Sequence, residues 1–324
     1  MQLRTRRLSL FTSLLLSVAA GACSGGHGRG DEPSAETTTE GASPTPQSTT
    51  LTIKGSDTMV ILAQRWAEAF MAANPGTTLQ VSGGGSGTGI AALINGTVDL
   101  ADASRPMKDR EKTQIRERRN GEAHEIPVAL DALAVYVHDD NPVHSLTIPQ
   151  LKQIFRGEVT NWNQVGGSDA AIVLYGRENN SGTYAYFKEH VLDDLDFAQE
   201  AQSLPGTAAV INAVSHDPGG VGYGGIAYAQ GVHTVSVAAE GGQPIEPNMQ
   251  NALDGSYPLS RFLYVYSVGQ PSGLAQRYVE FMLSSAGQAL VENVGYYPLP
   301  HEGAAEVPAP SGAAAPEAPA EPAQ

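Results

Sequence analysis

Short apolar stretches alternate with polar, glycine-rich turns between residues 51 and 300, and their spacing predicts alternating strands and helices. Leu62, Trp66 and Phe70 recur at every fourth position, which puts them on one face of a helix. Thr78–Ser82 alternates apolar with polar residues, as a half-buried strand does. A repeated order of strand, turn and helix is typical of parallel sheets, which hold ligands at the carboxyl ends of their strands.

The same periodicities predict the other elements of this segment. Strands are expected over residues 51–54, 78–82, 98–101, 128–137, 171–175, 219–226 and 263–268. Helices are expected over residues 59–73, 90–94, 148–155, 184–192, 274–283 and 286–294. We interpret the pattern as two α/β lobes, 51–127 plus 260–300 and 128–259, each with a mixed, mostly parallel sheet flanked by helices. Chain crossings near residues 127–130 and 257–261 would form the hinge between the lobes.

The two ends of the chain differ in composition from this segment. Residues 1–22 carry three arginines, then an apolar stretch, then small residues, which is the order of an export signal. Cys23, the only cysteine, follows, and the junction resembles a bacterial lipobox in which this cysteine is lipidated. Ordinary cleavage nearby, which would leave a free thiol, is the alternative. Residues 23–50 and the Ala/Pro/Glu-rich residues 301–324 cannot bury a core, so we expect a flexible tether and a disordered tail.

The charge balance excludes one class of partner. Of the formal net charge of −15, the predicted folded segment keeps −11, because the acidic tether and tail outweigh the basic signal. Nucleic-acid binding depends on neutralisation of phosphates by Lys and Arg, so an acidic core argues against it. An anion site in this chain must therefore depend on local dipoles and on one or two cations, not on the net charge.

Three short turns share the sequence Ser-x-Thr, and each precedes an apolar helical pattern. They are Ser56-Asp57-Thr58, Ser86-Gly87-Thr88 and Ser181-Gly182-Thr183. Ser and Thr at a helix start cap free backbone N–H groups, and glycine leaves such groups open to a ligand. Because these amides and the positive end of the helix dipole face the same point, each turn is a candidate anion site. Three such turns in one chain predict convergence on a single tetrahedral oxyanion.

Charged residues next to these turns refine the prediction. Arg177 follows a predicted strand and precedes the third turn, where its planar fork can hold two oxygens of an anion. A surface arginine paired with Glu178 is the alternative. Gly83–Gly89 lacks the lysine of a nucleotide-binding P-loop, which favours an anion cradle over an ATPase loop. Asp57 has two open interpretations: an acid at a helix N-terminus, or the acceptor of a proton carried by hydrogen phosphate.

Motifs for catalysis and metal binding are weak. No Gly-x-Ser-x-Gly elbow surrounds Ser86 or Ser181, and no His or Lys accompanies either serine in the sequence. The histidines are scattered without the spacing of metal ligands. We therefore expect a binding protein with neither a cofactor nor a metal, and not an enzyme.

Several segments together resemble the phosphate-binding subunit of bacterial ABC importers. They are residues 55–58, 82–89 with 94–99, 103–107 and 175–184, of which the last is the most specific. The resemblance covers residues 51–300 and implies a two-lobed, type II-like periplasmic-binding-protein fold that closes on phosphate and then docks on a membrane permease. The ligand contacts that it implies are Ser56, Asp57, Thr58, Ser86, Arg177, Ser181, Gly182 and Thr183.

One segment, Ala103–Pro106, departs from the family pattern. Several members of the family have an aspartate here that accepts the proton of phosphate, whereas this chain has no carboxylate in the segment. Asp57 is then the expected acceptor, with Asp102 and Asp131 as further candidates. Ser104 is expected to contact the ligand, and Arg105 to add positive charge.

The resulting prediction is an exported, lipid-anchored receptor that binds inorganic phosphate and delivers it to the permease of an ABC importer. We expect a monomer, held by its acyl anchor at the periplasmic face of a membrane or at the outer face of the cell membrane. Molybdate, tungstate or sulfate is the alternative ligand. A phosphomonoester hydrolase built on the same cradle is the alternative from a different class.

Overall fold

The computed structural model describes residues 49–300, so the predicted signal, the lipidation at Cys23, the tail and all but the end of the tether lie outside the described residues. The strands within this part are β1 Thr50–Gly55, β2 Thr78–Ser82, β3 Leu100–Ala103, β4 Ala123–Val137, β5 Ser145–Thr147, β6 Val173–Arg177, β7 Gln202–Leu204, β8 Gly220–Gly225, β9 His233–Ala238 and β10 Ser260–Val268. The α-helices are α1 Val60–Ala73, α2 Ser86–Asn95, α3 Asp109–Arg119, α4 Ile148–Phe155, α5 Gly182–Leu192, α6 Gly206–Ser215, α7 Met249–Leu253, α8 Gly273–Leu283 and α9 Ser285–Val294. Short 3₁₀ helices lie at Trp162–Val165, between α4 and β6, and at Ile226–Tyr228, between β8 and β9.

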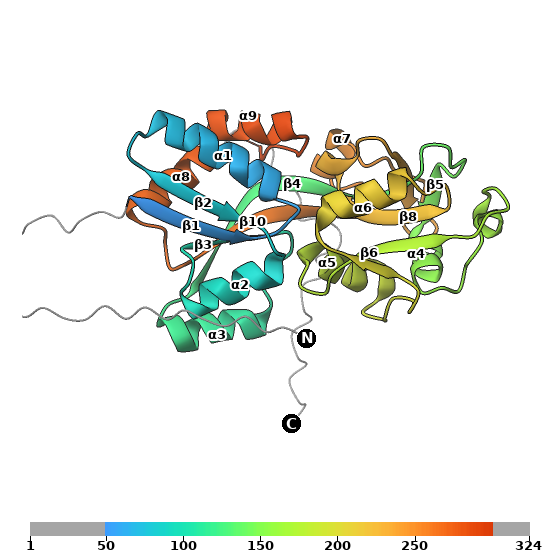
Figure 1. The fold of residues 1–324 in the computed structure, drawn as a ribbon, viewed down its shortest axis with the longest axis horizontal. Helices are drawn as coiled ribbons and strands as arrows, with labels where there is room; N and C mark the ends of the chain where they lie inside the picture. The colour runs from blue at the N-terminus through green and yellow to red at the C-terminus, as the bar shows by residue number, and fades with distance from the viewer. Residues whose placement is uncertain (1–48, 301–324) are drawn as a thin grey trace, which may run out of the picture. The chain divides into compact units, whose positions relative to one another are not determined.

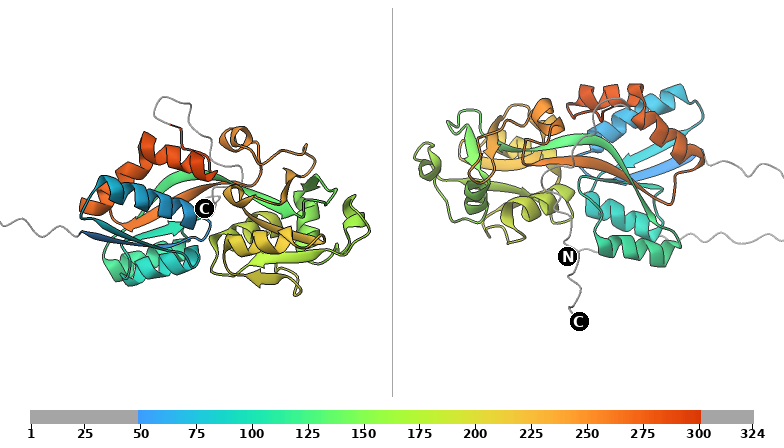
Figure 2. Two further views of the ribbon diagram at one scale, coloured as in Figure 1. Left: turned by 45° about the horizontal axis from the view of Figure 1, so that its top comes forward. Right: turned by 180° about the vertical axis from the view of Figure 1, so that it is seen from behind.

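The strands form one hydrogen-bonded network in the order β2-β1-β3-β10-β4-β8-β6-β7, with β9 pairing with β4 and β5. Strand β1 is parallel to β2 and β3, and β6 is parallel to β7 and β8. Strands β4 and β10 run antiparallel to their neighbours. We call β1–β3 with α1–α3, α8 and α9 the first lobe, and β5–β9 with α4–α7 the second lobe. The long strands β4 and β10 run side by side between the two lobes (Figure 2).

Strand β4 explains how one sheet serves both lobes. Residues 123–132 of β4 pair with β10, whereas residues 133–137 pair with β8 and, in part, with β9. The strand continues through residues 127 and 128, where the sequence predicts the border between the lobes, although its register against β10 shifts there, between Leu263 and Tyr264. The connection between the lobes is therefore a continuous strand, and the polypeptide needs no flexible linker there.

Helices cover both faces of each sheet portion (Figure 1). In the first lobe, α1, α8 and α9 pack on one face around Leu62, Trp66 and Leu100, and α2 and α3 pack on the other around Ile90 and Tyr266. In the second lobe, α4 and α5 bury Phe155 and Phe187 on one face, while α6 packs on the opposite face. Among the described residues, no helix combines the length and the apolar character needed to cross a bilayer.

Local signals set several element ends as predicted. Thr147 accepts a hydrogen bond from the Gln150 amide and completes a capping box, so α4 begins at the predicted residue. Gly295 adopts a left-handed conformation, φ 101°, directly after α9. The predicted strand at 98–101 is displaced: β3 begins at Leu100, because Ile53 of β1 pairs with this residue. Helix α3 was not predicted from the sequence, because its two buried residues, Glu111 and Ile115, make no apolar stripe.

Candidate functional site

The candidate ligand residues gather at the carboxyl ends of parallel strands. Residues 56–58 follow β1, Ser86 lies beyond β2, Ser104 follows β3, and residues 178–183 follow β6, which ends at Arg177. Such strand ends are the usual ligand sites of open α/β sheets. We call this set the cradle; its members are Ser56, Asp57, Thr58, Ser86, Ser104, Arg177, Ser181, Gly182 and Thr183.

Gly182 brings the two lobes into direct contact. This residue begins α5 in the second lobe, and a Cβ atom there would clash with Ser86 Oγ and lie 2.7 Å from Ser104 Oγ, both in the first lobe. Nearby, the Gly87 amide donates to the Asn180 carbonyl at 2.9 Å. The absence of a side chain at Gly182 therefore lets a helix N-terminus, which favours anions, face two hydroxyl groups of the other lobe.

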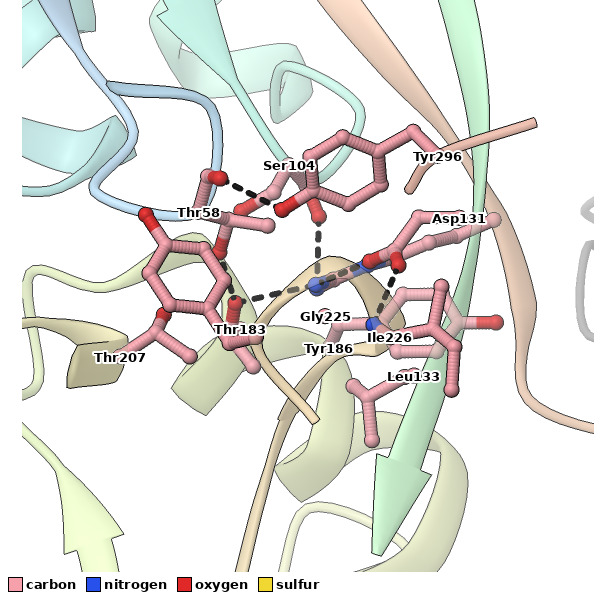
Figure 3. A network of polar contacts seen from close by, with 12 residues as sticks. Thr58, Ser104, Asp131, Leu133, Thr183, Tyr186, Thr207, Gly225, Ile226 and Tyr296 are labelled. Carbon is pink, nitrogen blue, oxygen red and sulfur yellow. Dashed lines mark hydrogen bonds and ion pairs between the residues drawn. The ribbon is translucent and has the colours of Figure 1, made fainter. Parts of the chain in front are cut away.

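The two threonines of the cradle form a second contact between the lobes. Thr58 Oγ1 and Thr183 Oγ1 are 2.8 Å apart, and both side chains are buried (Figure 3). The Tyr296 hydroxyl donates to the Thr58 carbonyl at 2.6 Å and fixes the turn that follows β1. Tyr296 was not among the predicted residues, because it lies 238 positions away in sequence.

Arg177 is buried between the lobes and is not a surface arginine paired with Glu178. Its Nη2 donates to Asp57 Oδ2 at 3.0 Å, and its Nη1 donates to Thr207 Oγ1 at 2.8 Å. Burial lowers the pKa of Arg177, and the adjacent Asp57 carboxylate opposes this shift. The Nε atom is buried and has no hydrogen-bond partner within residues 49–300. Arg177 also lines a cavity of about 510 Å³, but no other member of the cradle lines that cavity. Arg177, itself a member of the cradle, thus keeps one free donor among the described residues.

Asp57 bridges the loops around the cradle. Its Oδ1 accepts the Gly84 amide hydrogen at 2.7 Å, while Oδ2 accepts from Arg177. The interpretation of Asp57 as a helix N-cap is wrong, because the cap of α1 is Met59, which makes no side-chain cap bond. The carboxylate is 22% exposed, so it can still reach a ligand.

The capping role predicted for the three turns holds for one of them. Ser181 Oγ accepts the Tyr184 amide hydrogen at 3.3 Å and caps α5. Helix α2 begins four residues before the predicted position, so Ser86 is its first residue, and Gly85 is the N-cap without a side-chain bond. Ser86 Oγ instead accepts from the Ser104 amide at 3.1 Å.

Ser56 differs from the other hydroxyl residues of the cradle. Its backbone amide donates to the Asp102 carbonyl at 2.9 Å, which anchors the turn to β3. Its Oγ is buried and has no hydrogen-bond partner among the described residues. A buried hydroxyl without a partner is uncommon and marks a position where a ligand can complete the bonding.

Three other predicted residues are not members of the cradle, although the Asp102 carbonyl accepts the Ser56 amide hydrogen. The expectation that Arg105 adds charge is wrong, because its guanidinium makes two 2.8 Å bonds to Glu111. Asp131 is fully buried and pairs with Arg261. Burial raises the pKa of Asp102 from 3.8 to about 7. Arg261 and Thr207 were not predicted as site residues, since their partners are distant along the chain.

Comparisons with known proteins extend these observations. The sequence profile of the PBP superfamily domain matches residues 40–286. The phosphate-binding protein PstS of Pseudomonas aeruginosa is 40% identical over 264 residues, which cover 76% of this chain and 82% of that protein. The PstS of Bacillus subtilis is 30% identical over 250 residues, which cover 77% and 80%.

Solved structures agree with these relatives. A putative phosphate ABC transporter substrate-binding protein from Clostridium perfringens, crystallised with bound phosphate, superposes with a TM-score of 0.70 at 28% identity, over 78% of this chain and 100% of that chain. An ABC-type phosphate transport receptor from Vibrio cholerae superposes with a TM-score of 0.63 at 29% identity, over 77% and 100%. The two-lobed fold described above is the fold of these binding proteins.

Proposed function

Because the chain belongs to the PBP superfamily and, within it, to the family of the phosphate-binding proteins PstS, we propose that its cradle binds inorganic phosphate. The protein then delivers the anion to the permease of an ABC importer and performs no catalysis itself. The observation that carries this proposal is the approach of Gly182 to Ser86 and Ser104. An anion held beside this contact by donors from both lobes favours closure about β4 and β10.

The donors of the cradle are sufficient for tight binding without a metal. Hydroxyl groups come from both lobes, the first turn of α5 offers backbone amides, and Arg177 offers a cation with a free Nε. Micromolar binding requires about −8 kcal/mol. Roughly six hydrogen bonds to a charged ligand, at ~1.5–3 kcal/mol each, exceed this value before the cost of ordering is subtracted.

Asp57 provides the proposed selectivity. A carboxylate accepts a hydrogen bond from hydrogen phosphate but repels sulfate, which carries no proton at neutral pH. Both Asp57 oxygens already accept one bond, and each retains a lone pair for a protonated ligand. In this arrangement Arg177 attracts the negative charge of the anion, and Asp57 favours an anion that carries a proton.

The proposal extends to the parts of the chain that hold the receptor in place. We propose that Cys23 is acylated and anchors a monomer at the cell envelope, with residues 23–50 as its tether. The predicted bounds of the lobes, 51–127 with 260–300 and 128–259, divide the chain within or at the shared strands β4 and β10, and the two lobes close as rigid bodies about these strands. Replacement of Cys23 by Ala should release the protein from the membrane fraction, and mass spectrometry of the mature N-terminus should detect the acyl group. Release without any acyl mass in the wild type would contradict the anchor.

Calorimetry on the phosphate-stripped protein tests the ligand. We expect a micromolar or lower Kd for phosphate and at least about tenfold weaker binding of sulfate, molybdate and tungstate. A preference for one of these other anions would identify the alternative ligand. Turnover of a chromogenic phosphate ester would instead favour a hydrolase. Absence of phosphate binding in the micromolar range would overturn the proposed function.

A further inference from the structure

A fully buried guanidinium lies directly behind the cradle. Arg261 is 1% exposed and pairs with Asp131, which is 0% exposed, through Nε–Oδ2 at 3.0 Å and Nη2–Oδ2 at 2.8 Å. The two residues face each other in register on β10 and β4. The second oxygen of Asp131 accepts the Ile226 amide hydrogen at 3.1 Å (Figure 3). The guanidinium is therefore fixed to the two strands that the lobes share.

From this position Arg261 also bonds to the cradle on both sides. Its Nη1 donates to the Ser104 carbonyl of the first lobe at 3.0 Å, and its Nη2 donates to Thr183 Oγ1 of the second lobe at 3.1 Å. The Tyr186 ring covers the group, with its centroid 5.4 Å from the guanidinium carbon. None of these bonds requires a ligand, so Arg261 acts on the cradle through Ser104 and Thr183.

The chemistry of a guanidinium sets the direction of the hydrogen bonds in this arrangement. A guanidinium donates hydrogen bonds and accepts none, so Thr183 Oγ1 must accept from Arg261. The proton of Thr183 is then free for Thr58 Oγ1, 2.8 Å away, or for an anion. When a chain of hydroxyls begins at a group that can only donate, each hydroxyl accepts from the group before it and donates to the next, so the last hydroxyl is a donor. The members of such a chain also polarise one another. The cradle end of this chain therefore presents a proton, as an anion requires, and not a lone pair.

We propose that Arg261, held by Asp131, is a positioning residue that orients the Thr183 and Thr58 hydroxyls as donors and holds Ser104 in place for the ligand. The inference rests on the proposed function, because it assumes that an oxyanion occupies the cradle. Arg261 lies on β10, a strand that the two lobes share. From this fixed position it bonds to Ser104 of the first lobe and to Thr183 of the second lobe.

The first test removes the cation together with its counter-ion. A double variant, Arg261→Met with Asp131→Asn, leaves no unpaired buried charge, and the introduced amide oxygen can still accept from Ile226. The matched control is Arg105→Met with Glu111→Gln, a buried pair that makes no bond to the cradle. We expect phosphate binding at least ~10-fold weaker in the first variant and within about threefold of wild type in the control.

A coupling measurement separates positioning from general support of the fold. Thr183→Val is made in the wild type and in the Arg261 double variant, and phosphate Kd values are measured for all four proteins. If Arg261 acts through Thr183, the valine weakens binding strongly in the wild type but by less than about threefold in the variant background. Equal fold-changes in both backgrounds would overturn the inference.

A conservative variant tests the hydrogen bonds of Arg261 while the positive charge beside Asp131 is retained. Arg261→Lys keeps a positive charge beside Asp131, but an ammonium group cannot bond to Asp131, Ser104 and Thr183 from one plane. We expect a folded protein by circular dichroism with weaker phosphate binding and the same reduced effect of Thr183→Val. Wild-type affinity in Arg261→Lys would overturn the inference alone. A wild type that binds none of phosphate, arsenate, sulfate and molybdate would overturn both the proposed function and this inference.

Discussion

The ion pairs Asp57–Arg177 and Asp131–Arg261 use the same chemistry in two differently built regions. Their Nη2–Oδ2 distances are 3.0 and 2.8 Å. The first pair joins the turn after β1 to the end of β6 in the other lobe, and its carboxylate is 22% exposed. The second pair joins register neighbours on adjacent strands, with a carboxylate that is fully buried.

This difference assigns the two pairs different mechanical roles. A bond between neighbouring strands is retained as long as the strands stay paired, whereas a bond between lobes can form and break when the lobes move. Removal of one partner also lowers the free energy of unfolding more for a buried pair than for a partly exposed one, because the remaining buried charge has neither its partner nor water around it. Arg261 thus belongs to the fixed frame of the molecule, and Arg177 belongs to the part that we propose contacts the ligand.

The largest expected effect is on ligand binding when Arg177 is replaced. Arg177→Met removes the cation of the cradle, while the partly exposed Asp57 can be hydrated, so we expect little loss of stability. Phosphate binding should weaken by about 3 kcal/mol, roughly 100-fold or more in Kd. Calorimetry measures the change, with Arg156→Met, which breaks a surface pair of the same lobe, as the control. Unchanged affinity would show that Arg177 only braces the lobes.

The next effect concerns Asp102, a buried carboxyl that belongs to no ion pair among residues 49–300. Burial raises its pKa from 3.8 to about 7, so the folded protein holds this proton more tightly than the unfolded chain does. Its contribution to stability is complete below about pH 4 and is lost as the pH rises through about 7. Asp102→Asn should remove this loss.

Urea unfolding of the wild type and Asp102→Asn at about pH 5 and about pH 8 measures the effect. The free energy of unfolding of the variant, relative to wild type, should rise by roughly 2–3 kcal/mol between the two pH values. The exposed Glu117→Gln serves as the control and should show no comparable change. A pH-independent difference for Asp102→Asn would mean that Asp102 is ionised in the fold at both pH values.

A smaller effect is expected for Asp57→Asn, which removes the carboxylate charge from the Asp57–Arg177 pair and keeps the shape of the side chain. The variant should still bind phosphate, but the ratio of phosphate to sulfate affinity should fall by about tenfold, or ~1.4 kcal/mol. Competition calorimetry with both anions measures the ratio. Asp140→Asn, at a carboxylate that is 91% exposed, is the control. An unchanged ratio would assign the acceptor role to another group.

The smallest expected effect is that of Ser56→Ala. Because Ser56 Oγ is buried and finds no hydrogen-bond partner in the described part of the chain, its removal should leave the unfolding temperature unchanged or slightly raised. Phosphate binding should weaken by about 1 kcal/mol, roughly fivefold. Ser181→Ala provides the contrast, because this hydroxyl caps α5 and its loss should lower stability by about 1 kcal/mol. Destabilisation by Ser56→Ala would indicate a structural role for its hydroxyl.

Elements with strong local patterns could be predicted from the sequence. Helix α4 and strand β2 have the predicted bounds, because a capping box, an apolar period and a nearby turn act over a few residues. Helix α3 escaped prediction because it exposes most of its polar residues and is held by the buried ion pair of Arg105 and Glu111. Similarly, the start of α2 could not be read from its apolar residues, since Gly85 allows the helix to begin at Ser86.

The sequence by itself determined which residue types are available to hold an anion and in which short turns they occur. It could not determine that Asp57 meets Arg177, since the two are 120 residues apart and belong to different lobes. The partnership of Asp131 with Arg261 depends on the register of β4 against β10, across 130 residues. Only the tertiary structure decided these pairs, because strand pairing and the approach of the lobes are set by burial across the whole fold and not by neighbours in sequence.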